Sequence, residues 1–517
     1  MAVLLVAACS SSGSDGSETP ASGEDEEPTT LTIAVEGDIT TLDAHGGAGI
    51  LDRNILQNVH EGLIRRDGST GEVIPHIATE WEVSEDQLTW TMKLRDDVYF
   101  HDGQQLTAAD VKASAERLLD PELAAQQSGV FSNLAEVVVV DDFTADFKLS
   151  VPEPLFIIFC ERMTLVPAGW AEEVGPTIYT GDDPIGLGAY KVAEWVRGER
   201  LVLEANEDYF LGAPEIDELI FRPIPDEASR VAALRAGEVD IVDPLSSALR
   251  EQVEGDSTLK IVESLSMGRV RVTIDQRVAP FDVKEVRQAI NHAIDVDTII
   301  EELVPGAVRT PAALVPEEVG FDSTLEPYDY DPDRARELLA DAGFADGIGP
   351  VELSVNPSYP QMEEAAQAVQ SYLSEVGIET TIRVYDPGDF TTRKREKFDN
   401  PAGLGPLHMD GHSGGNTFHG YHIYSNVINC TDASPVHSGY GCNADVERLL
   451  GEALAMWTQD EEAAIEKFHE MEAVLQEDAW AGFLYQVPAL NGAKADLEWE
   501  PSPAEPLQMR FARWSSS

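Results

Sequence analysis

The chain has 517 residues, of which 43% are apolar, and its 94 acidic residues outnumber 35 basic ones to give a net charge of −59. A chain of this length exceeds a single hydrophobic core, so we expect about two or three domains. The negative charge repels nucleic-acid phosphates and anionic lipid surfaces, which argues against nucleic-acid binding. We interpret most of this charge as a solvated acidic surface. Attraction of a cationic ligand would be a minor second role of the acidic residues.

The N-terminal stretch has the character of an export signal followed by a tether. An apolar run ends in Val6-Ala7-Ala8-Cys9, and a run rich in Ser, Gly, Glu, Asp and Pro follows as far as Thr30. Small residues before a cysteine resemble a bacterial lipoprotein box, whose cysteine becomes lipidated. No Lys or Arg precedes the apolar run, so the true start is expected upstream. We expect residues 1–30 to be a signal remnant and flexible tether, with Cys9 as the lipid anchor of an otherwise soluble body.

The other three cysteines have different surroundings. Cys430 and Cys442 are 12 positions apart in a loop rich in Asn, Ser, Gly and Asp, whereas Cys160 follows the apolar run 155–159. A local disulfide between Cys430 and Cys442 fits an oxidising exterior and would contribute about 3 kcal/mol. Zinc is less favoured because neither residue belongs to a C-x-x-C pair. Cys160 is expected to be buried and inert.

Near the N-terminus we predict a strand at 31–35 and a helix at 52–63. The segment 78–111 then has the clearest pattern of secondary-structure signals in the chain. Residues 87–94 alternate apolar and polar, as in a strand whose buried face is formed by Leu88, Trp90, Met92 and Leu94. The turn His101-Asp102-Gly103 comes next, and Thr107 is placed to cap a helix over 108–118. The stripe predicted to be buried on that helix consists of Val111, Ala115 and Leu118.

The rest of the chain alternates strands with helices, which is typical of α/β folds. A hairpin is predicted at 137–140 and 145–149, and a glycine-containing crossover at 184–188. Further strands are predicted at 216–222, 351–355, 379–384 and 482–486. Further helices are predicted at 226–234, 283–304, 361–376, 444–457 and 460–479, together with one that starts at Pro332 after the cap Asp331 and ends before Gly343.

Several of these segments resemble motifs of one protein family. The segment 78–111 and the residues just before it read P-x-I-A-x-x-W-x-x-S-x-D-x-L-x-W, then K-L-R-D-x-V-x-F-H-D-G, then L-T-A-x-D-V. Thr41-Leu42-Asp43, Gly186-Leu187-Gly188, Asn206–Phe210 and Arg287–Asp295 match further motifs. This pattern is similar to the large extracytoplasmic solute-binding proteins, family 5, which deliver peptides, nickel chelates and some oligosaccharides to ABC importers. The resemblance covers about residues 31–514.

The resemblance implies an α/β fold of the type II periplasmic-binding-protein kind, with two lobes and an additional inserted domain. Lobe I is expected at 31–65, 182–268 and 485–517, the inserted domain II at 66–181 and lobe III at 269–484. The implied partners are a peptide or other small solute and ABC permease subunits, with membrane contact only through the lipid anchor. We expect an extracytoplasmic monomer with no cofactor and no catalytic residue.

Ligand chemistry is expected in the segment 399–422, which is rich in Gly, His and aromatic residues and which we predict to be an irregular loop. Residues 407–418 resemble the W-x-x-D-x-x-D-P-x-N-F cleft segment of peptide receptors, where the first Asp pairs with the α-ammonium of the peptide. Asp410 falls on that position, although Leu407 replaces the Trp and Ser413-Gly414 replaces Asp-Pro. The residues predicted to bind ligand are Asp410, His408, His412, Asn416, Phe418 and Tyr421.

The same segment supports two alternatives. Gly411-His412-Ser413-Gly414-Gly415 satisfies G-x-S-x-G, but a serine hydrolase needs a strand before this motif and a helix after it, and neither is predicted. The four histidines His408, His412, His419 and His422 could bind nickel, zinc or a metal chelate. An irregular loop is a poor frame for a fixed metal site, so we predict none and interpret these histidines as polar lining of the binding cleft.

The sequence also bears on the length of the peptide that would bind, because a basic residue that dipeptide receptors of the family use is missing here. Dipeptide receptors of the family hold the ligand carboxylate with an Arg just after the strand that here ends at Val355. Residues 356–370 contain no Arg or Lys. A buried carboxylate without a partner costs several kcal/mol, so the sequence predicts weak binding of dipeptides and a preference for longer or cationic ligands.

Overall fold

The computed structural model describes residues 28–46, 49–67, 72–359, 361–396, 403–412, 419–426, 441, 443–502 and 506–515. The largest sheet has eleven strands. These are β1 (Thr30–Val35), β8 (Tyr190–Val196), β9 (Arg200–Ala205), β10 (Glu218–Pro223), β11 (Ile241–Asp243), β12 (Leu259–Ile274), β13 (Val308–Arg309), β14 (Ile348–Val355), β15 (Ile378–Val384), β16 (Leu407–His412) and β17 (Ala481–Lys494). Their order is β15-β14-β16-β12-β17-β11-β1-β10-β9-β8, and β13 pairs with β17.

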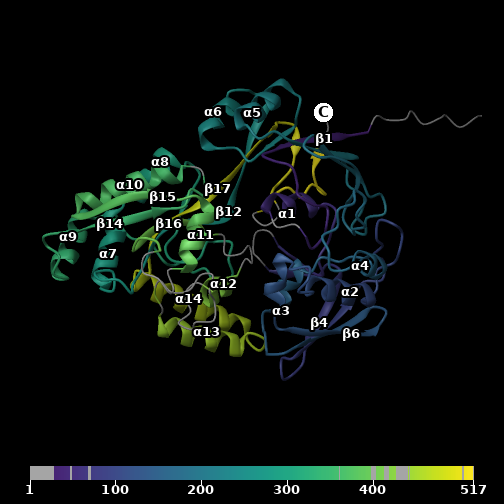
Figure 1. The fold of residues 1–517 in the computed structure, drawn as a ribbon, viewed down its shortest axis with the longest axis horizontal. Coiled ribbons are helices and arrows are strands. Elements are labelled where there is room, and N and C mark those ends of the chain that lie inside the picture. Colours follow the sequence, from purple (N-terminus) through teal and green to yellow (C-terminus); the bar gives the residue numbers. More distant parts are fainter. Residues whose placement is uncertain are drawn as a thin grey trace, which may run out of the picture.

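Two long strands, β12 and β17, run antiparallel through the middle of this sheet, with a register shift between Leu265 and Arg269. At one end β12 pairs with β16, and at the other end β17 pairs with β11. The two ends belong to different hydrophobic cores, because Val270 and Val272 pack in one and Leu259 in another. In Figure 1 these strands link the part that contains α5 (Glu227–Ala236) and α6 (Arg250–Glu254) to the part that contains α7 (Lys284–Ala293) and α10 (Met362–Glu375).

A second, four-stranded sheet has the order β4-β5-β7-β6. Its strands are β4 (Ala78–Val83), β5 (Thr89–Leu94), β6 (Leu134–Asp141) and β7 (Thr144–Leu149), and helix α2 (Ala108–Leu118) packs on it. Three of the four residues predicted for the buried face of the strand are buried, whereas Leu88 precedes β5 and is half-buried. The predicted stripe on α2 is buried as expected.

Helix α2 is capped at its start and contacts the Thr41-Leu42-Asp43 motif near its end. Asp110 accepts hydrogen bonds from the backbone N–H of Thr107 at 2.8 Å and from its hydroxyl at 2.9 Å, so the predicted cap acts through the carboxylate. At the other end Arg117 donates two hydrogen bonds to Asp43, at 2.9 and 2.6 Å, and both side chains are buried. The ion pair therefore joins the Thr41-Leu42-Asp43 motif to the helix that packs on the four-stranded sheet.

The glycines of the crossover are explained by close backbone contact. A Cβ on Gly186 would lie 1.9 Å from the Val59 carbonyl oxygen, and one on Gly188 would lie 2.3 Å from that of Asn58. The His101 ring binds the same crossover, with Nε2 3.0 Å from the Gly188 carbonyl oxygen. Burial lowers the pKa of His101 to about 4, so the ring is neutral at pH 7. The His101-Asp102-Gly103 turn and the Gly186-Leu187-Gly188 crossover therefore contact each other directly.

Two helices differ from their predictions. The first, α1 (Ile50–Leu56), ends earlier than expected, because the Asn58 amide bonds the carbonyl of Ile55 and also that of the distant Leu507. The helix predicted at 283–304 is two helices, α7 and α8 (Val296–Leu303). The break occurs at Asp295, whose side chain accepts from the Thr298 N–H and caps α8.

The remaining elements follow the predicted order. Asp331 caps α9 (Pro332–Asp341) through the Arg334 N–H, and Gly343 has a positive φ of 90° just beyond the helix. The other helices are α3 (Phe156–Phe159), α4 (Ala168–Val174), α11 (Pro387–Glu396), α12 (Tyr421–Asn426), α13 (Ala444–Met456) and α14 (Glu461–Glu477). The short strands are β2 (Arg65–Arg66), β3 (Val73–Ile74), β18 (Leu497–Glu498) and β19 (Arg513–Trp514).

The segment 399–422 is predicted as an irregular loop, and this is wrong for Leu407–His412 and for residues 421–422, whereas residues 403–406 lie outside any helix or strand as predicted. Leu407–His412 forms strand β16 between β12 and β14, because the alternating Leu407 and Met409 fill the core beside α10. A strand therefore does lead into Gly411-His412, although Ser413 lies outside the described residues. Cys160 is fully buried as expected, and burial raises its pKa. In the described ranges, helices long and apolar enough to cross a membrane are absent.

Candidate functional site

Strands β12 and β16 present a polar face on the side of the sheet opposite α7 and α10. Along β12 the apolar residues Val270, Val272 and Ile274 enter the core, and the residues between them point the other way. Register pairing places Arg269 opposite His412, Arg271 opposite Asp410 and Thr273 opposite His408. Side chains directly opposite each other on antiparallel strands share a face, so Arg271, Asp410, Thr273 and His408 form one polar patch.

Asp410 lies at the centre of this patch with only 2% of its surface exposed. It accepts from the Lys394 ammonium of α11 at 2.5 Å and from the Thr273 hydroxyl at 3.2 Å. Burial alone would raise the pKa of this carboxyl, but the charge of Lys394, with His408 and Arg271 nearby, holds it well below its usual range. Asp410 is therefore a buried anion, and in this structure its counter-ion is Lys394.

Arg271 is the second charged group of the patch. Its Nε donates to the Thr273 hydroxyl at 3.2 Å, and its guanidinium carbon lies 4.7 Å from the centroid of the Trp480 ring. Burial lowers the pKa of Arg271 to about 10, although the charge of Asp410 opposes this shift. Within the described residues its buried Nη1 has no hydrogen-bond partner. A buried N–H donor without a partner costs about 1–3 kcal/mol, which a bound acceptor would recover.

Arg269 belongs to a separate structural network beside the patch. It is buried and forms a bidentate pair with Glu318, at 2.6 and 2.7 Å. The neighbouring Glu472 accepts from the Tyr424 hydroxyl at 2.6 Å and from the Leu314 N–H at 3.1 Å. Burial raises the pKa of Glu472 to about 7, against the effect of these hydrogen bonds. These contacts hold the Arg269 guanidinium and the Glu472 carboxyl group, although the buried Arg269 Nε has no hydrogen-bond partner among the described residues.

The other residues predicted to bind ligand have different positions. His408 is fully buried, with its ring centroid 5.8 Å from that of Phe390 in α11. The Tyr421 ring centroid lies 6.4 Å from that of Phe159, which belongs to the inserted region. The His412 side chain, Asn416 and Phe418 lie outside the part that the structure describes, as do Cys9, Cys430 and Cys442. Among the described residues, groups of three or more His, Cys, Asp or Glu that could hold a metal ion are absent.

A large cavity lies between the inserted region and the helices α13 and α14, with a volume of about 980 Å³. Its walls combine apolar rings and branched side chains from both sides with a rim of carboxylates. The apolar walls comprise Trp81, Trp90, Ile157, Ile158, Val319, Phe321 and Trp457, and the carboxylates are Glu72, Glu461, Glu462 and Glu466. Gln87 of the inserted sheet donates across to the Thr458 hydroxyl at 3.2 Å, so the two sides are in contact.

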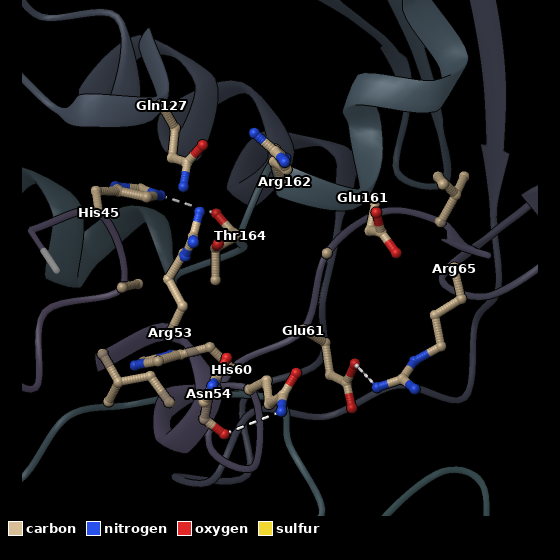
Figure 2. Close-up of a pocket in the computed structure, with 15 residues that line it drawn as sticks. His45, Arg53, Asn54, His60, Glu61, Arg65, Gln127, Glu161, Arg162 and Thr164 are labelled. Atoms are coloured by element: carbon tan, nitrogen blue, oxygen red, sulfur yellow. Dashed lines mark hydrogen bonds and ion pairs between the residues drawn. The ribbon is translucent and has the colours of Figure 1, made fainter. Parts of the chain in front are cut away.

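A smaller cavity of about 170 Å³ lies where α1 meets the inserted region. Figure 2 shows Arg53 and Arg162 directed toward its upper part, near His45, Gln127 and Thr164. At the other end Glu61 points toward Arg65, with which it forms an ion pair at 3.2 Å. The charged residues that line this cavity are three arginines, Arg53, Arg65 and Arg162, and two glutamates, Glu61 and Glu161.

Sequence reasoning missed Arg271, Lys394 and the arginines of the small cavity. A signal for Arg271 is present, because the run Arg269–Ile274 alternates basic or polar residues with β-branched apolar ones. Such alternation predicts a strand with a charged face. Arg271 lies opposite Asp410, so a basic residue outside 356–370 is present beside this carboxylate, and weak binding of dipeptides stays a prediction.

Residues 72–412 match the family described as bacterial extracellular solute-binding proteins, family 5. Among curated proteins, the glutathione-binding protein GsiB of Salmonella paratyphi A is 28% identical over 377 residues, which cover 72% of this chain and 73% of that protein.

Solved structures share the fold. CtaP from Listeria monocytogenes, an ABC transporter substrate-binding protein, matches with a TM-score of 0.83 at 23% identity, over 95% of this chain and 100% of that one. The periplasmic binding protein DppA from Helicobacter pylori, in complex with the peptide STSA, matches with a TM-score of 0.74 at 22% identity, over 95% of this chain and 99% of that one. The fold is therefore that of type II periplasmic binding proteins. The matched segment, which spans most of the described chain, shows that this protein belongs to the bacterial extracellular solute-binding proteins, family 5.

Proposed function

We propose that this chain is the substrate-binding protein of an ABC importer and that it captures a peptide-like solute. The observation that carries the proposal is the patch on β12 and β16, where a carboxylate and a guanidinium lie opposite each other in register and both are buried. A peptide main chain carries an ammonium at one end and a carboxylate at the other. Asp410 and Arg271 have the charges that would pair with these two ends.

The cavities support a ligand larger than an amino acid. Binding sites for small ligands commonly enclose about 300–1,000 Å³ and combine apolar walls with a few polar groups. The cavity of about 980 Å³ lies in that range and is lined by residues of the inserted region and of the segment 319–469. The relatives bind ligands of this class, since GsiB is named for glutathione and DppA was solved with a four-residue peptide.

Lobe I is proposed at 31–65, 182–268 and 485–517, domain II at 66–181 and lobe III at 269–484. The register shift between Leu265 and Arg269 supports a junction there, because a broken ladder bends more easily than a continuous one. Closure of the lobes about β12 and β17 would then enclose the ligand. The lipid anchor at Cys9 and the disulfide between Cys430 and Cys442 remain part of this proposal, on the sequence patterns alone.

Native mass spectrometry of the purified full chain, followed by denaturation and identification of the released small molecules, tests the function. A peptide or peptide-like compound in stoichiometric amount is the expected result. Release of an oligosaccharide or of a nickel chelate instead would assign the chain to another ligand class of the same family. Protein expressed without a His tag serves as the control against adventitious metal.

A further inference from the structure

Both oxygens of the Asp410 carboxylate are already bonded by groups of the protein. Oδ2 accepts from the Lys394 ammonium at 2.5 Å, and Oδ1 accepts from the Thr273 hydroxyl at 3.2 Å. Burial opposes ionisation of this carboxyl, and the charge of Lys394 is the largest influence that lowers its pKa against that effect. The position that a ligand ammonium would take beside Asp410 is therefore filled by a residue of the chain.

Helix α11 holds Lys394 in this position. Phe390 lies four residues before Lys394, so the two side chains share one face of the helix. Phe390 is buried in a small core with Tyr385 and Leu404, and its ring lies 5.8 Å from that of His408 on β16. An ammonium tethered in this way has an effective concentration of about 1 mM or more. A dilute solute ammonium would gain nothing by replacing it.

The Arg271 guanidinium, in contrast, has bonding capacity left over. Its Nε donates to the Thr273 hydroxyl at 3.2 Å, and this is the one hydrogen bond that its side chain forms within the described ranges. The Trp480 ring lies against the guanidinium, with its centroid 4.7 Å from the central carbon. The buried Nη1 has no hydrogen-bond partner among the residues that the structure describes. The end of the side chain is thus positioned but not saturated.

The charges around Arg271 are also out of balance. Burial lowers its pKa to about 10, so it stays charged at pH 7. Asp410 supplies one negative charge against the two positive charges of Arg271 and Lys394. The neighbouring Arg269 already has its own partner in Glu318. A bound carboxylate would balance the excess charge, and a guanidinium can hold it through two parallel hydrogen bonds.

We infer that Lys394 fills the ammonium position of the patch from within the chain, and that the group of the solute recognised there is a carboxylate bound by Arg271. The amino end of the solute then needs no charge. This inference rests on the proposed function and narrows it to solutes that carry a carboxylate, whether their amino end is free or blocked.

The test uses Ala-Ala-Ala in three forms, titrated calorimetrically into the full chain: with both ends free, with an acetylated amino end and with an amidated carboxyl end. The wild type should bind the free and acetylated forms within about threefold of each other, and the amidated form at least about tenfold more weakly. Lys394→Met vacates the ammonium position, so it should prefer the free form over the acetylated form by at least about tenfold. Lys112→Met, which removes the exposed pair with Glu116, should behave as the wild type.

A preference of the wild type for the free over the acetylated form of about tenfold or more would overturn the inference and leave the proposed function intact. Equal affinity of the wild type for the free and amidated forms would do the same, and so would a folded Lys394→Met that binds the free and acetylated forms equally. Melting temperatures show whether each variant folds. If Lys394→Met does not fold, the comparison in the wild type decides.

If none of the three forms binds, capture of this peptide fails and small ions test the patch separately. Sodium acetate should then raise the melting temperature of the wild type more than sodium chloride does at equal concentration, and Arg271→Gln should lose this difference. Ethylammonium chloride should give the wild type no such increase. Stabilisation of the wild type by ethylammonium, or none by acetate, would overturn the inference.

Discussion

Lys394 donates to the buried Asp410 at 2.5 Å, so the carboxylate expected to hold a ligand ammonium already has an ammonium beside it. The two residues come from different elements, α11 and β16. The side chain of Lys394 is 14% exposed and that of Asp410 3%. A ligand ammonium would therefore have to share Asp410 with Lys394 or displace it.

Replacing Lys394 by Met should destabilise the protein by about 3–5 kcal/mol, because Asp410 is left as a buried charge without its principal partner. Urea unfolding at pH 7 measures this, and Lys112→Met is the matched control. Lys112 pairs with Glu116 on the exposed face of α2, where the loss should stay within about 1 kcal/mol. Added ethylammonium should restore part of the lost stability of Lys394→Met and should have no such effect on Lys112→Met. Equal effects of both substitutions would show that the Lys394 pair contributes no more than a surface pair.

Arg271→Gln should weaken binding of peptides that end in a free carboxylate by about 2–5 kcal/mol, the usual loss when one member of a buried charge pair is removed. Peptides with an amidated C-terminus should bind the wild type and the variant with similar affinity. Competition binding with one sequence in both forms measures the difference. If the variant loses the acid and the amide equally, Arg271 holds the fold of the site and does not contact the ligand end.

Glu472 should give the stability an unusual pH dependence. Its pKa rises from 4.5 to about 7 in the folded protein, so the folded state keeps this proton between those values and the unfolded state does not. The free energy of unfolding contributed by Glu472 therefore falls as pH rises through that window. Unfolding curves of Glu472→Gln and the wild type should be closest near pH 4.5. The variant should gain relative stability up to about pH 7, and a constant difference would argue against this shift.

Glu61 should give the stability the opposite pH dependence, because its contribution to the free energy of unfolding is lost as pH falls. Burial opposes its ionisation, but Arg65 and His76 lower the pKa of Glu61 to about 2. Its stabilising effect is fully present above 4.5, the ordinary value, and is lost as pH falls toward 2. Glu61→Gln should be strongly destabilising at pH 7 and approach the wild type below pH 4. The surface variant Glu80→Gln, which removes a pair with Lys93, should show almost no effect across this range.

The fold could be predicted because its markers are local. The capped helix after Thr107, the glycines at 186 and 188 and the cap at Asp331 each lie within a few residues of the structure they specify. The breaks were harder to predict, since the end of α1 depends on a contact between Asn58 and Leu507, which lie far apart in the sequence. The spacing of apolar residues along the sequence carries no information about such long-range contacts.

The site was only half predictable for the same reason. Asp410 is found from its motif, but its partners come from two other elements, Arg271 from β12 and Lys394 from α11. Their proximity depends on which strands pair and in which register, and this is decided by packing of the whole sheet. The small cavity beside α1 likewise has lining residues from distant parts of the chain, such as Arg53 of α1 and Arg162.

Calorimetric titration of the full wild-type chain with a panel of peptides of two to five residues, glutathione included, tests the central claim most directly. The account predicts saturable binding of at least one peptide with a stoichiometry near one and a Kd of about 1 μM or tighter. That binding should be lost in the double variant Asp410→Asn and Arg271→Gln, whose melting temperature is checked in parallel. Titrations without heat for any peptide, or binding that is unchanged in a folded double variant, would contradict it.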